Sequence, residues 1–182
     1  MNLNFTSTPV LTTERLLLRG LNEEDFQAVH QLRSDPTVNA FVGRTNSSTL
    51  ESAKAYILKM NNLVDKKECL YWAITSIADK TFLGSVCLWN FDTENEIVEI
   101  GYELLSEFQS KGYMSEALKA VIEFAFTTMN AKLITAFPSA DNSNSVSILK
   151  KLGFIFDDKP YNNKHDNIKN ITTYILKPSL VS

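Results

Sequence analysis

The chain has 182 residues, of which 44% are hydrophobic and 21% charged, and its net charge is −3. This composition is ordinary for one folded domain with a sizeable core, which we expect to span residues 1–182. The acidic balance argues against a broad nucleic-acid surface, and no apolar run approaches the ~20 residues that cross a bilayer. Residues 1–8 lack the basic and apolar regions of a signal peptide, so we expect a cytoplasmic protein with neither a nucleic-acid nor a membrane partner.

Hydrophobic alternation predicts strands at residues 15–20, 70–77, 81–89, 97–104, 132–137, 154–156 and 170–176. Helical spacing predicts helices from residue 22 up to Pro36, from Ser48 to Val64, at 115–129 and at 145–152. The first helix has an acidic start, and the second opens with a capping box of Ser48 and Glu51. Three consecutive strands indicate an antiparallel meander, and residues 162–167 indicate a mobile polar loop. The predicted fold class is α/β, an α+β sandwich around a mixed, mostly antiparallel sheet.

Between the fourth strand and the third helix lies a short polar turn, Gln109-Ser110-Lys111-Gly112. Such a turn presents unpaired backbone N–H groups at a helix N-terminus, where the helix dipole also favours an anion. Gly112 lets a ligand oxygen approach the backbone closely. A plain strand-to-helix turn explains the same residues. A phosphate cradle beside the strand carboxylate Glu99 suggests a nucleotide-tailed cofactor held next to a proton acceptor.

This turn resembles the pyrophosphate loop of the GNAT acyltransferase superfamily, Gln/Arg-x-x-Gly-x-Gly/Ala, with Met114 in place of the small last residue. Three further stretches resemble, in the expected order, the group of ribosomal-protein-alanine/serine N-acetyltransferases within that superfamily. They are Leu11-x-Thr13-x-Arg15-Leu16-x-Leu18-Arg19, Glu99-Ile100-Gly101-Tyr102 and Asn142-x-x-Ser145-x-x-Ile148-Leu149-x-Lys151-x-Gly153-Phe154. Together the matches cover residues 8–177, nearly the whole chain.

The resemblance implies a central sheet of about seven strands flanked by about four helices, with the fourth and fifth strands splayed around a pantetheine arm. It implies acetyl-CoA as the acyl donor, and we expect no metal. The cofactor-binding residues that it implies are Tyr102, Glu103, Leu104, Gln109, Ser110, Lys111, Gly112, Tyr113, Met114, Asn142 and Ser145. Backbone N–H groups at 102–104 would meet the oxyanion. The bulky Met114 side chain is expected to narrow the pyrophosphate site.

Glu99 shares one strand face with Gly101 and Glu103, away from the more apolar face. The pattern alone is typical of a solvated carboxylate. The resemblance implies that Glu99 is the general base, acting directly or through water. Glu103 is interpreted either as a second carboxylate on the acceptor side or as a surface group.

Asn142 and Ser145 precede the last helix, where asparagine favours turns and serine favours the helix N-cap. The resemblance adds a cofactor role: Asn142 would contact the pantetheine arm, and Ser145 would protonate the leaving thiolate. It also implies that the segment at 39–46, with Phe41 and Arg44, helps to line the acceptor site. His30 and His165 are given no role.

The predicted activity is acetyl-CoA-dependent N-acetylation of a primary amine by direct attack in a ternary complex. A protein N-terminal α-amine and a small amine are both open as acceptors. Roughly a tenth of an α-amine is free base at pH 7, against less than about 0.1% of a lysine amine, which favours the α-amine slightly. The alternative is a catalytically weak acyl-CoA-binding regulatory module. We also expect reduced thiols at Cys69 and Cys87, and a second copy of the chain as partner in a homodimer.

Overall fold

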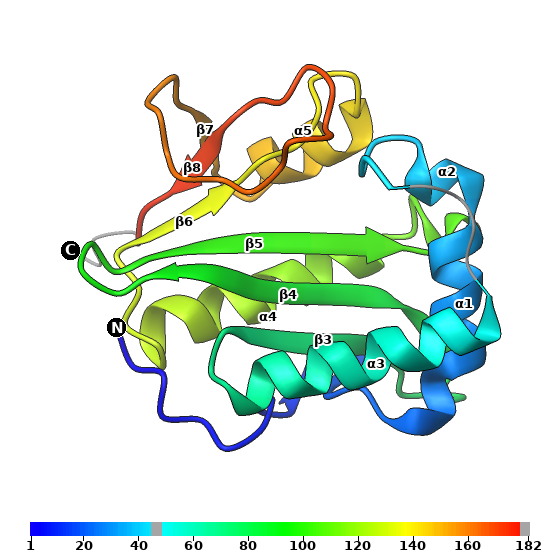
Figure 1. Ribbon diagram of the computed structural model, residues 1–182. Helices are drawn as coiled ribbons and strands as arrows, with labels where there is room; N and C mark the ends of the chain where they lie inside the picture. Colours follow the sequence, from blue (N-terminus) through cyan, green and yellow to red (C-terminus); the bar gives the residue numbers. More distant parts are fainter. Residues whose placement is uncertain (45–48, 179–182) are drawn as a thin grey trace.

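The computed structural model describes residues 1–44 and 49–178. Its centre is an eight-stranded sheet in the order β1-β2-β3-β4-β5-β6-β8-β7 (Figure 1). The strands are β1 (Leu11–Thr12), β2 (Leu16–Arg19), β3 (Cys69–Ser76), β4 (Phe82–Asp92), β5 (Ile97–Leu104), β6 (Leu133–Ala136), β7 (Ile155–Phe156) and β8 (Tyr174–Leu176). The helices are α1 (Phe26–Ser34), α2 (Pro36–Asn39), α3 (Leu50–Asp65), α4 (Tyr113–Thr127) and α5 (Ser143–Lys151), with 3-10 turns at Glu23–Asp25 and Ser106–Phe108.

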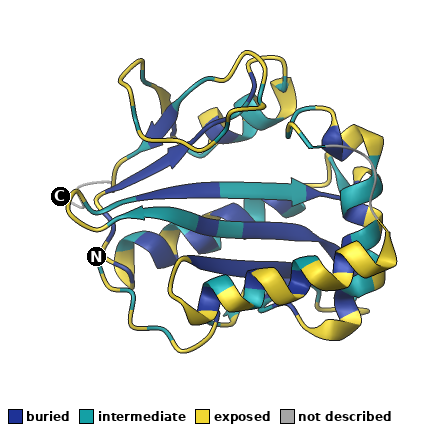
Figure 2. Ribbon diagram, viewed as in Figure 1, coloured by how far each residue is buried: buried dark blue, intermediate teal, exposed yellow. Residues whose placement is uncertain are grey.

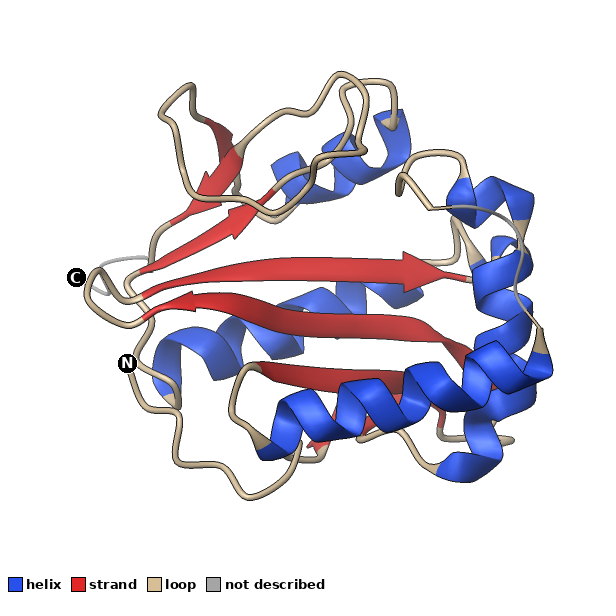
Figure 3. Ribbon diagram, viewed as in Figure 1, coloured by secondary structure: helices blue, strands red, loops and turns tan. Residues whose placement is uncertain are grey.

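Helices cover both faces of the sheet, with α3 in front and α4 behind (Figure 3). Behind the sheet, Val121 of α4 belongs to the same buried apolar cluster as Ile100 of β5. In front, Ile57 of α3 shares a second cluster with Tyr71 of β3. Side chains alternate along β5, and Glu99 is paired in register with Trp89, which packs against the front cluster. Glu99 therefore lies on the face opposite the α4 layer.

β5 and β6 are parallel neighbours that pair over only a short distance. Their register runs from Ile97 with Leu133 to Glu99 with Thr135, while β5 continues to Leu104. The two strands therefore part beyond Glu99, as the expected splay requires. The central strands around this point are largely buried (Figure 2).

The sheet has one strand more than expected, because Leu11–Thr12 pairs antiparallel with β2. A short helix, α2, was also missed. Pro36 suits the first helical turn, and the Asp35 carboxylate accepts hydrogen bonds from the amides of Thr37 at 2.8 Å and Val38 at 3.3 Å. The last strand is shorter than predicted, because Ile171 forms an isolated bridge with Ser139 and the continuous pairing begins at Tyr174.

The predicted cap of α3 is wrong by one residue. Ser48 lies outside the described residues, and the capping box is formed by Thr49 and Ser52 rather than by Ser48 and Glu51. The Ser52 amide donates to Thr49 Oγ1 at 3.1 Å, and the Thr49 amide donates to Ser52 Oγ at 2.8 Å. The predicted apolar stripe is confirmed, since α3 buries Ala53, Ile57, Met60 and Val64.

Candidate active site

The loop before α4 has a backbone suited to an anion. Ser110 and Gly112 both have left-handed backbone angles, with φ of 61° and 83°. Gly112 is the residue that precedes the first turn of α4, so the unpaired amides of that turn follow it directly. Left-handed residues in a turn aim successive N–H groups into one concavity, which binds phosphate oxygens well. The predicted phosphate loop therefore has the required local geometry.

Two side chains hold this loop in place. The Gln109 amide nitrogen donates to the carbonyl oxygen of Leu104 at 3.0 Å, which ties the loop to the end of β5. Arg15, which precedes β2, donates to the carbonyl oxygen of Lys111 at 3.2 Å and to Glu116 Oε2 at 2.7 Å. Arg15 therefore forms an ion pair with Glu116 and is not simply a solvated residue at the edge of the sheet.

A cavity of about 590 Å³ opens where β5 and β6 part. Its lining combines β5, the phosphate loop, the first turns of α4 and α5, and the segment after α2. It contains ten of the eleven predicted cofactor residues, namely Tyr102, Glu103, Leu104, Gln109, Ser110, Gly112, Tyr113, Met114, Asn142 and Ser145, together with the acceptor candidate Phe41. Lys111 is not in this lining, and its ammonium group lies 5.6 Å from the ring centre of Phe108.

Met114 borders the cavity but is largely buried. Its side chain is 4% exposed and packs in the buried cluster behind the sheet, with Leu118 and Val121 of the same helix. The position lies inside α4, and a helical side chain there turns toward the core. The unusual residue in the motif therefore contributes apolar packing.

The start of α5 corrects the predicted helix cap and shows that Tyr102 is the partner of Ser145. Asn142, not Ser145, caps the helix, and its side-chain oxygen accepts from the Ser145 amide at 3.1 Å. Ser145 lies in the first turn, and its hydroxyl is 2.7 Å from the hydroxyl of Tyr102. Burial raises the pKa of Tyr102 to about 12, so the phenol is neutral at physiological pH and keeps its proton.

Comparisons with known proteins agree with this geometry. The family model described as acetyltransferase (GNAT) domain matches residues 15–155. The chain belongs to the GNAT acetyltransferase family. It is 32% identical over 143 residues to the N-acetyltransferase YnaD of Bacillus subtilis (strain 168), covering 79% of this chain and 81% of the relative.

Solved structures share the fold of this GNAT domain. The ribosomal-protein-S5-alanine acetyltransferase from Vibrio fischeri matches with a TM-score of 0.76 and 20% identity, over 96% of this chain and 99% of that one. The spermidine N-acetyltransferase from Vibrio cholerae, in complex with CoA and spermine, matches with a TM-score of 0.75 and 15% identity, over 91% and 96%. This chain therefore shares its overall fold with both structures.

In this GNAT domain Glu99 is not a solvated carboxylate. It is 2% exposed, and its two oxygens have different partners. Oε2 accepts from the side-chain amide of Asn90 at 3.2 Å, and Oε1 bonds to Nε2 of His165. Sequence reasoning missed His165 because it lies 66 residues away in a polar loop, and no local pattern links the two.

Glu103 is also paired. The Arg44 guanidinium forms an ion pair with Glu103 Oε1 and donates to Asn39 Oδ1, and both charged side chains are less than 20% exposed. Glu103 is therefore not a free surface group, and the two predicted acceptor-side residues contact each other. Phe41 lines the cavity, whereas Arg44 does not.

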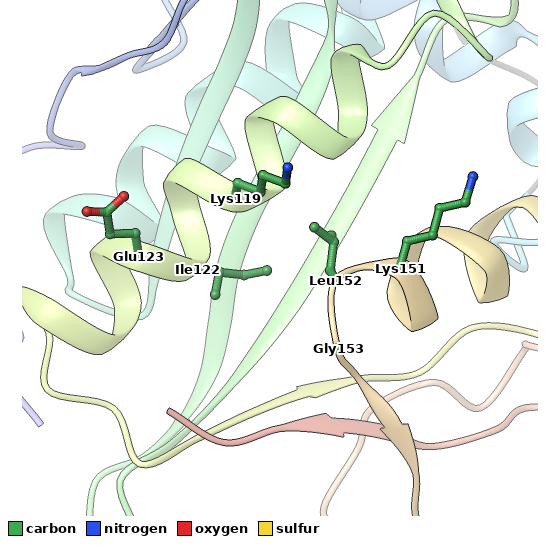
Figure 4. Close-up of a pocket in the computed structure, with 6 residues that line it drawn as sticks. All are labelled: Lys119, Ile122, Glu123, Lys151, Leu152 and Gly153. Carbon is green, nitrogen blue, oxygen red and sulfur yellow. The ribbon is translucent and has the colours of Figure 1, made fainter. Parts of the chain in front are cut away.

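A second, shallower hollow of about 430 Å³ lies between α4 and the end of α5 (Figure 4). It is lined by Lys119, Ile122, Glu123, Lys151, Leu152 and Gly153. It contains none of the predicted catalytic residues. Lys151 also lines the main cavity, so the hollow adjoins it.

Residues 1–44 and 49–178 contain no group of three or more His, Cys, Asp or Glu side chains that could hold a metal ion. Cys69 and Cys87 are free thiols, as predicted. Across the described part of the chain, no helix is both long and apolar enough to span a membrane.

Proposed function

We propose that this domain transfers the acetyl group of acetyl-CoA to a primary amine by direct attack in a ternary complex. The observation that carries the proposal is the cavity at the splay. It joins an anion-binding turn, a gap between two strands and a pair of hydroxyl groups within one continuous lining. Acetyl-CoA supplies an activated thioester carbonyl when bound, so the enzyme must place an amine and manage protons.

The residues at the cavity fit the acyl donor. The amides after Gly112 would hold the pyrophosphate, and the unpaired edge of β5 beyond Glu99 would receive the pantetheine arm. Backbone N–H groups near Tyr102 and Glu103 would meet the developing oxyanion. Lys151, which joins the two hollows, would add positive charge near the nucleotide end. Asn142 would contact the arm while it caps α5.

Glu99 is proposed as the general base. It lies on β5 at the last residue that pairs with β6, and contacts with Asn90 and His165 hold its two oxygens in place. The first β5 residue in the cavity lining is Tyr102, three residues beyond Glu99 and roughly 10 Å along a strand, so we place water between Glu99 and the acceptor amine. The competing candidate Glu103 is occupied by the Arg44 guanidinium.

Ser145 is proposed to act on the leaving sulfur, with Tyr102 behind it. A phenol with a pKa of about 12 is a weaker acid than a thiol of about 8.5, so complete proton transfer from Tyr102 is unfavourable. The pair would instead donate a hydrogen bond that stabilises the departing thiolate. Tyr102 orients the Ser145 hydroxyl, because the two oxygens are 2.7 Å apart.

A protein N-terminal α-amine is the acceptor that we favour over a polyamine. The structural neighbours include enzymes of both kinds. A polyamine carries several ammonium groups, which call for uncompensated carboxylates on the acceptor side. Here Glu99 faces His165 and Glu103 faces Arg44, so neither carboxylate is left for a second ammonium group.

The test is thiol release from acetyl-CoA with a panel of N-terminal peptides, the same peptides with blocked N-termini, free lysine derivatives and spermidine. We expect release with free N-termini and a mass increase of one acetyl group on the peptide. Release with spermidine alone would overturn the acceptor assignment. Tight acetyl-CoA binding without release to any amine would favour the regulatory module.

A further inference from the structure

The chain between β7 and β8, residues 157–173, covers the face of the sheet that carries Glu99, and we call this segment the roof. In Figure 1 this segment, drawn in orange, passes in front of β6 before it returns to β8. The Asn90 side chain donates to the carbonyl oxygen of Asn162 at 2.9 Å as well as to Glu99, so one amide joins the roof to β4 and β5. A Cβ on Gly43 would lie 2.7 Å from the carbonyl oxygen of Asn167, so the roof also packs closely on the segment after α2.

His165 is the roof residue that reaches the interior. Its Nε2 bonds to Glu99 Oε1, and its ring packs against Trp89 at 5.5 Å and Phe137 at 5.8 Å between ring centres. The ring is thus held by two aromatic walls while one edge points at the carboxylate. Its side chain is 23% exposed, against 2% for Glu99. The imidazole therefore lies between a buried carboxylate and solvent.

We propose that His165 relays the acceptor's proton from Glu99 to solvent, an inference that rests on the proposed function. Glu99 is 2% exposed, so its carboxylate has little direct contact with bulk water, yet it must lose one proton in every cycle. An imidazole can accept a proton on one ring nitrogen and release one from the other near neutral pH. His165 acts through Glu99, so it is a positioning residue rather than one that touches the acceptor.

The proton balance is complete without any further reactant. The acceptor ammonium loses one proton to Glu99 through water and becomes the nucleophile. When the amine nitrogen bonds to the acetyl carbon and the carbon–sulfur bond breaks, the second proton ends on the thiol. The proton on Glu99 Oε1 passes to Nε2 of an imidazole that carries its hydrogen on Nδ1, and the imidazolium releases the Nδ1 proton to water. Proton exchange of the partly exposed ring with water then restores the starting tautomer before the next cycle. The sum is an acetamide, a free thiol and one proton.

The charged and titratable groups around this pair come from several elements. Glu99 on β5 faces the ring directly, whereas β4 and the end of β6 present Trp89, Asn90 and Phe137. The thiol of Cys87 on β4 has a pKa well above the ordinary value, mainly because it is buried and also because Glu99 carries a negative charge nearby. Within the roof, Lys164 and Asp166 are sequence neighbours of His165 and are exposed.

The test compares His165→Gln and His165→Ala in the full chain, with His30→Gln as the matched control on the other histidine. His165→Gln keeps a hydrogen-bond donor but cannot relay a proton. We expect kcat to fall about 10²-fold at neutral pH, with KM for acetyl-CoA and the melting temperature little changed. The kcat of His165→Ala should fall similarly and recover as free imidazole is added. The kcat of wild type and of His30→Gln should not respond to imidazole.

The relay and the proposed function fail in different ways. Full activity in His165→Gln, or no response of His165→Ala to imidazole, would overturn the relay and leave the acetyltransferase proposal intact. In the Glu99→Gln background, loss of His165 should cost nothing further, because the relay has no proton to carry. A further large loss there would also overturn the relay. Absence of thiol release in the wild type with every amine would overturn the proposed function and the relay together.

Discussion

The hydroxyl groups of Tyr102 and Ser145 lie 2.7 Å apart and join β5 to the first turn of α5. Both residues line the cavity. The capping of α5 by Asn142 leaves the Ser145 hydroxyl available to Tyr102 and to a ligand. The helix cap, Asn142, and the residue proposed to act on the leaving sulfur, Ser145, are therefore different residues, and mutation can separate their effects.

Ser145→Ala is expected to lower turnover about tenfold or more, because a hydrogen bond to a charged group contributes about 1.5–3 kcal/mol. The melting temperature should stay close to that of wild type, since Ser145 is not the cap. Tyr102→Phe should cost less, because Ser145 would still reach the sulfur. Steady-state kinetics beside thermal melting separates these effects, and unchanged kcat in Ser145→Ala would remove Ser145 from the mechanism.

Asn142→Ala should destabilise the fold by about 1 kcal/mol, the usual value of a helix N-cap side chain. The free energy of unfolding from urea titration measures this directly. Ser145→Ala is the matched variant, with a loss well below that of Asn142→Ala. Equal losses in the two variants would contradict the assignment of Asn142 as the cap.

Glu99→Gln keeps the shape of the side chain and removes the proton acceptor. We expect kcat to fall about 10²–10⁴-fold near neutral pH, with acetyl-CoA affinity nearly unchanged. Activity should partly recover as pH rises toward the pKa of the acceptor amine, about 8 for an α-amine and about 10.4 for lysine. A pH–rate profile that is the same in both proteins would show that Glu99 is not the base.

Gly112→Val is expected to weaken acetyl-CoA binding strongly, because a β-branched residue at φ of 83° is strained and its side chain blocks the approach to the amides. An added Cβ would also lie 3.3 Å from the Arg15 guanidinium. Lys111→Ala should have a smaller effect, since Lys111 does not line the cavity. Calorimetric titration with acetyl-CoA measures both, and the reverse order would contradict the backbone cradle.

The Arg15–Glu116 pair predicts a pH-dependent effect on stability. Burial alone would raise the pKa of Glu116, but hydrogen bonds from Thr13 and Arg15 outweigh it and lower the pKa below the ordinary value of 4.5. A lowered folded-state pKa stabilises the protein above pH 4.5 and ceases to do so as pH falls through the folded-state value. Glu116→Gln should therefore melt lower than wild type at pH 7, and the difference should shrink on acidification. A difference that is constant with pH would exclude this linkage.

Local patterns predicted the elements that depend on near neighbours. The meander, the amphipathic α3 and α4, and the polar turn with Gly112 follow from periodicity and from the backbone freedom of glycine, which act within a few residues. Ten of the eleven cofactor residues implied by the resemblance line one cavity, because the motifs that carry them lie at the end of β5 and at the starts of α4 and α5. Errors fell at short elements and caps, where one residue decides between alternatives, as with Thr49 and Asn142.

The tertiary structure alone decided which side chains meet across the fold. The sequence pattern predicted that Glu99 points away from the more apolar face of its strand, whereas its burial and its contact with His165, 66 residues later, are seen only in the structure. Arg15 reaches Glu116 and the loop at Lys111, and Arg44 reaches Glu103, through contacts that no periodicity encodes. Such partners are set by how β-strands distant in sequence pair, because strand order brings together residues that the chain itself separates.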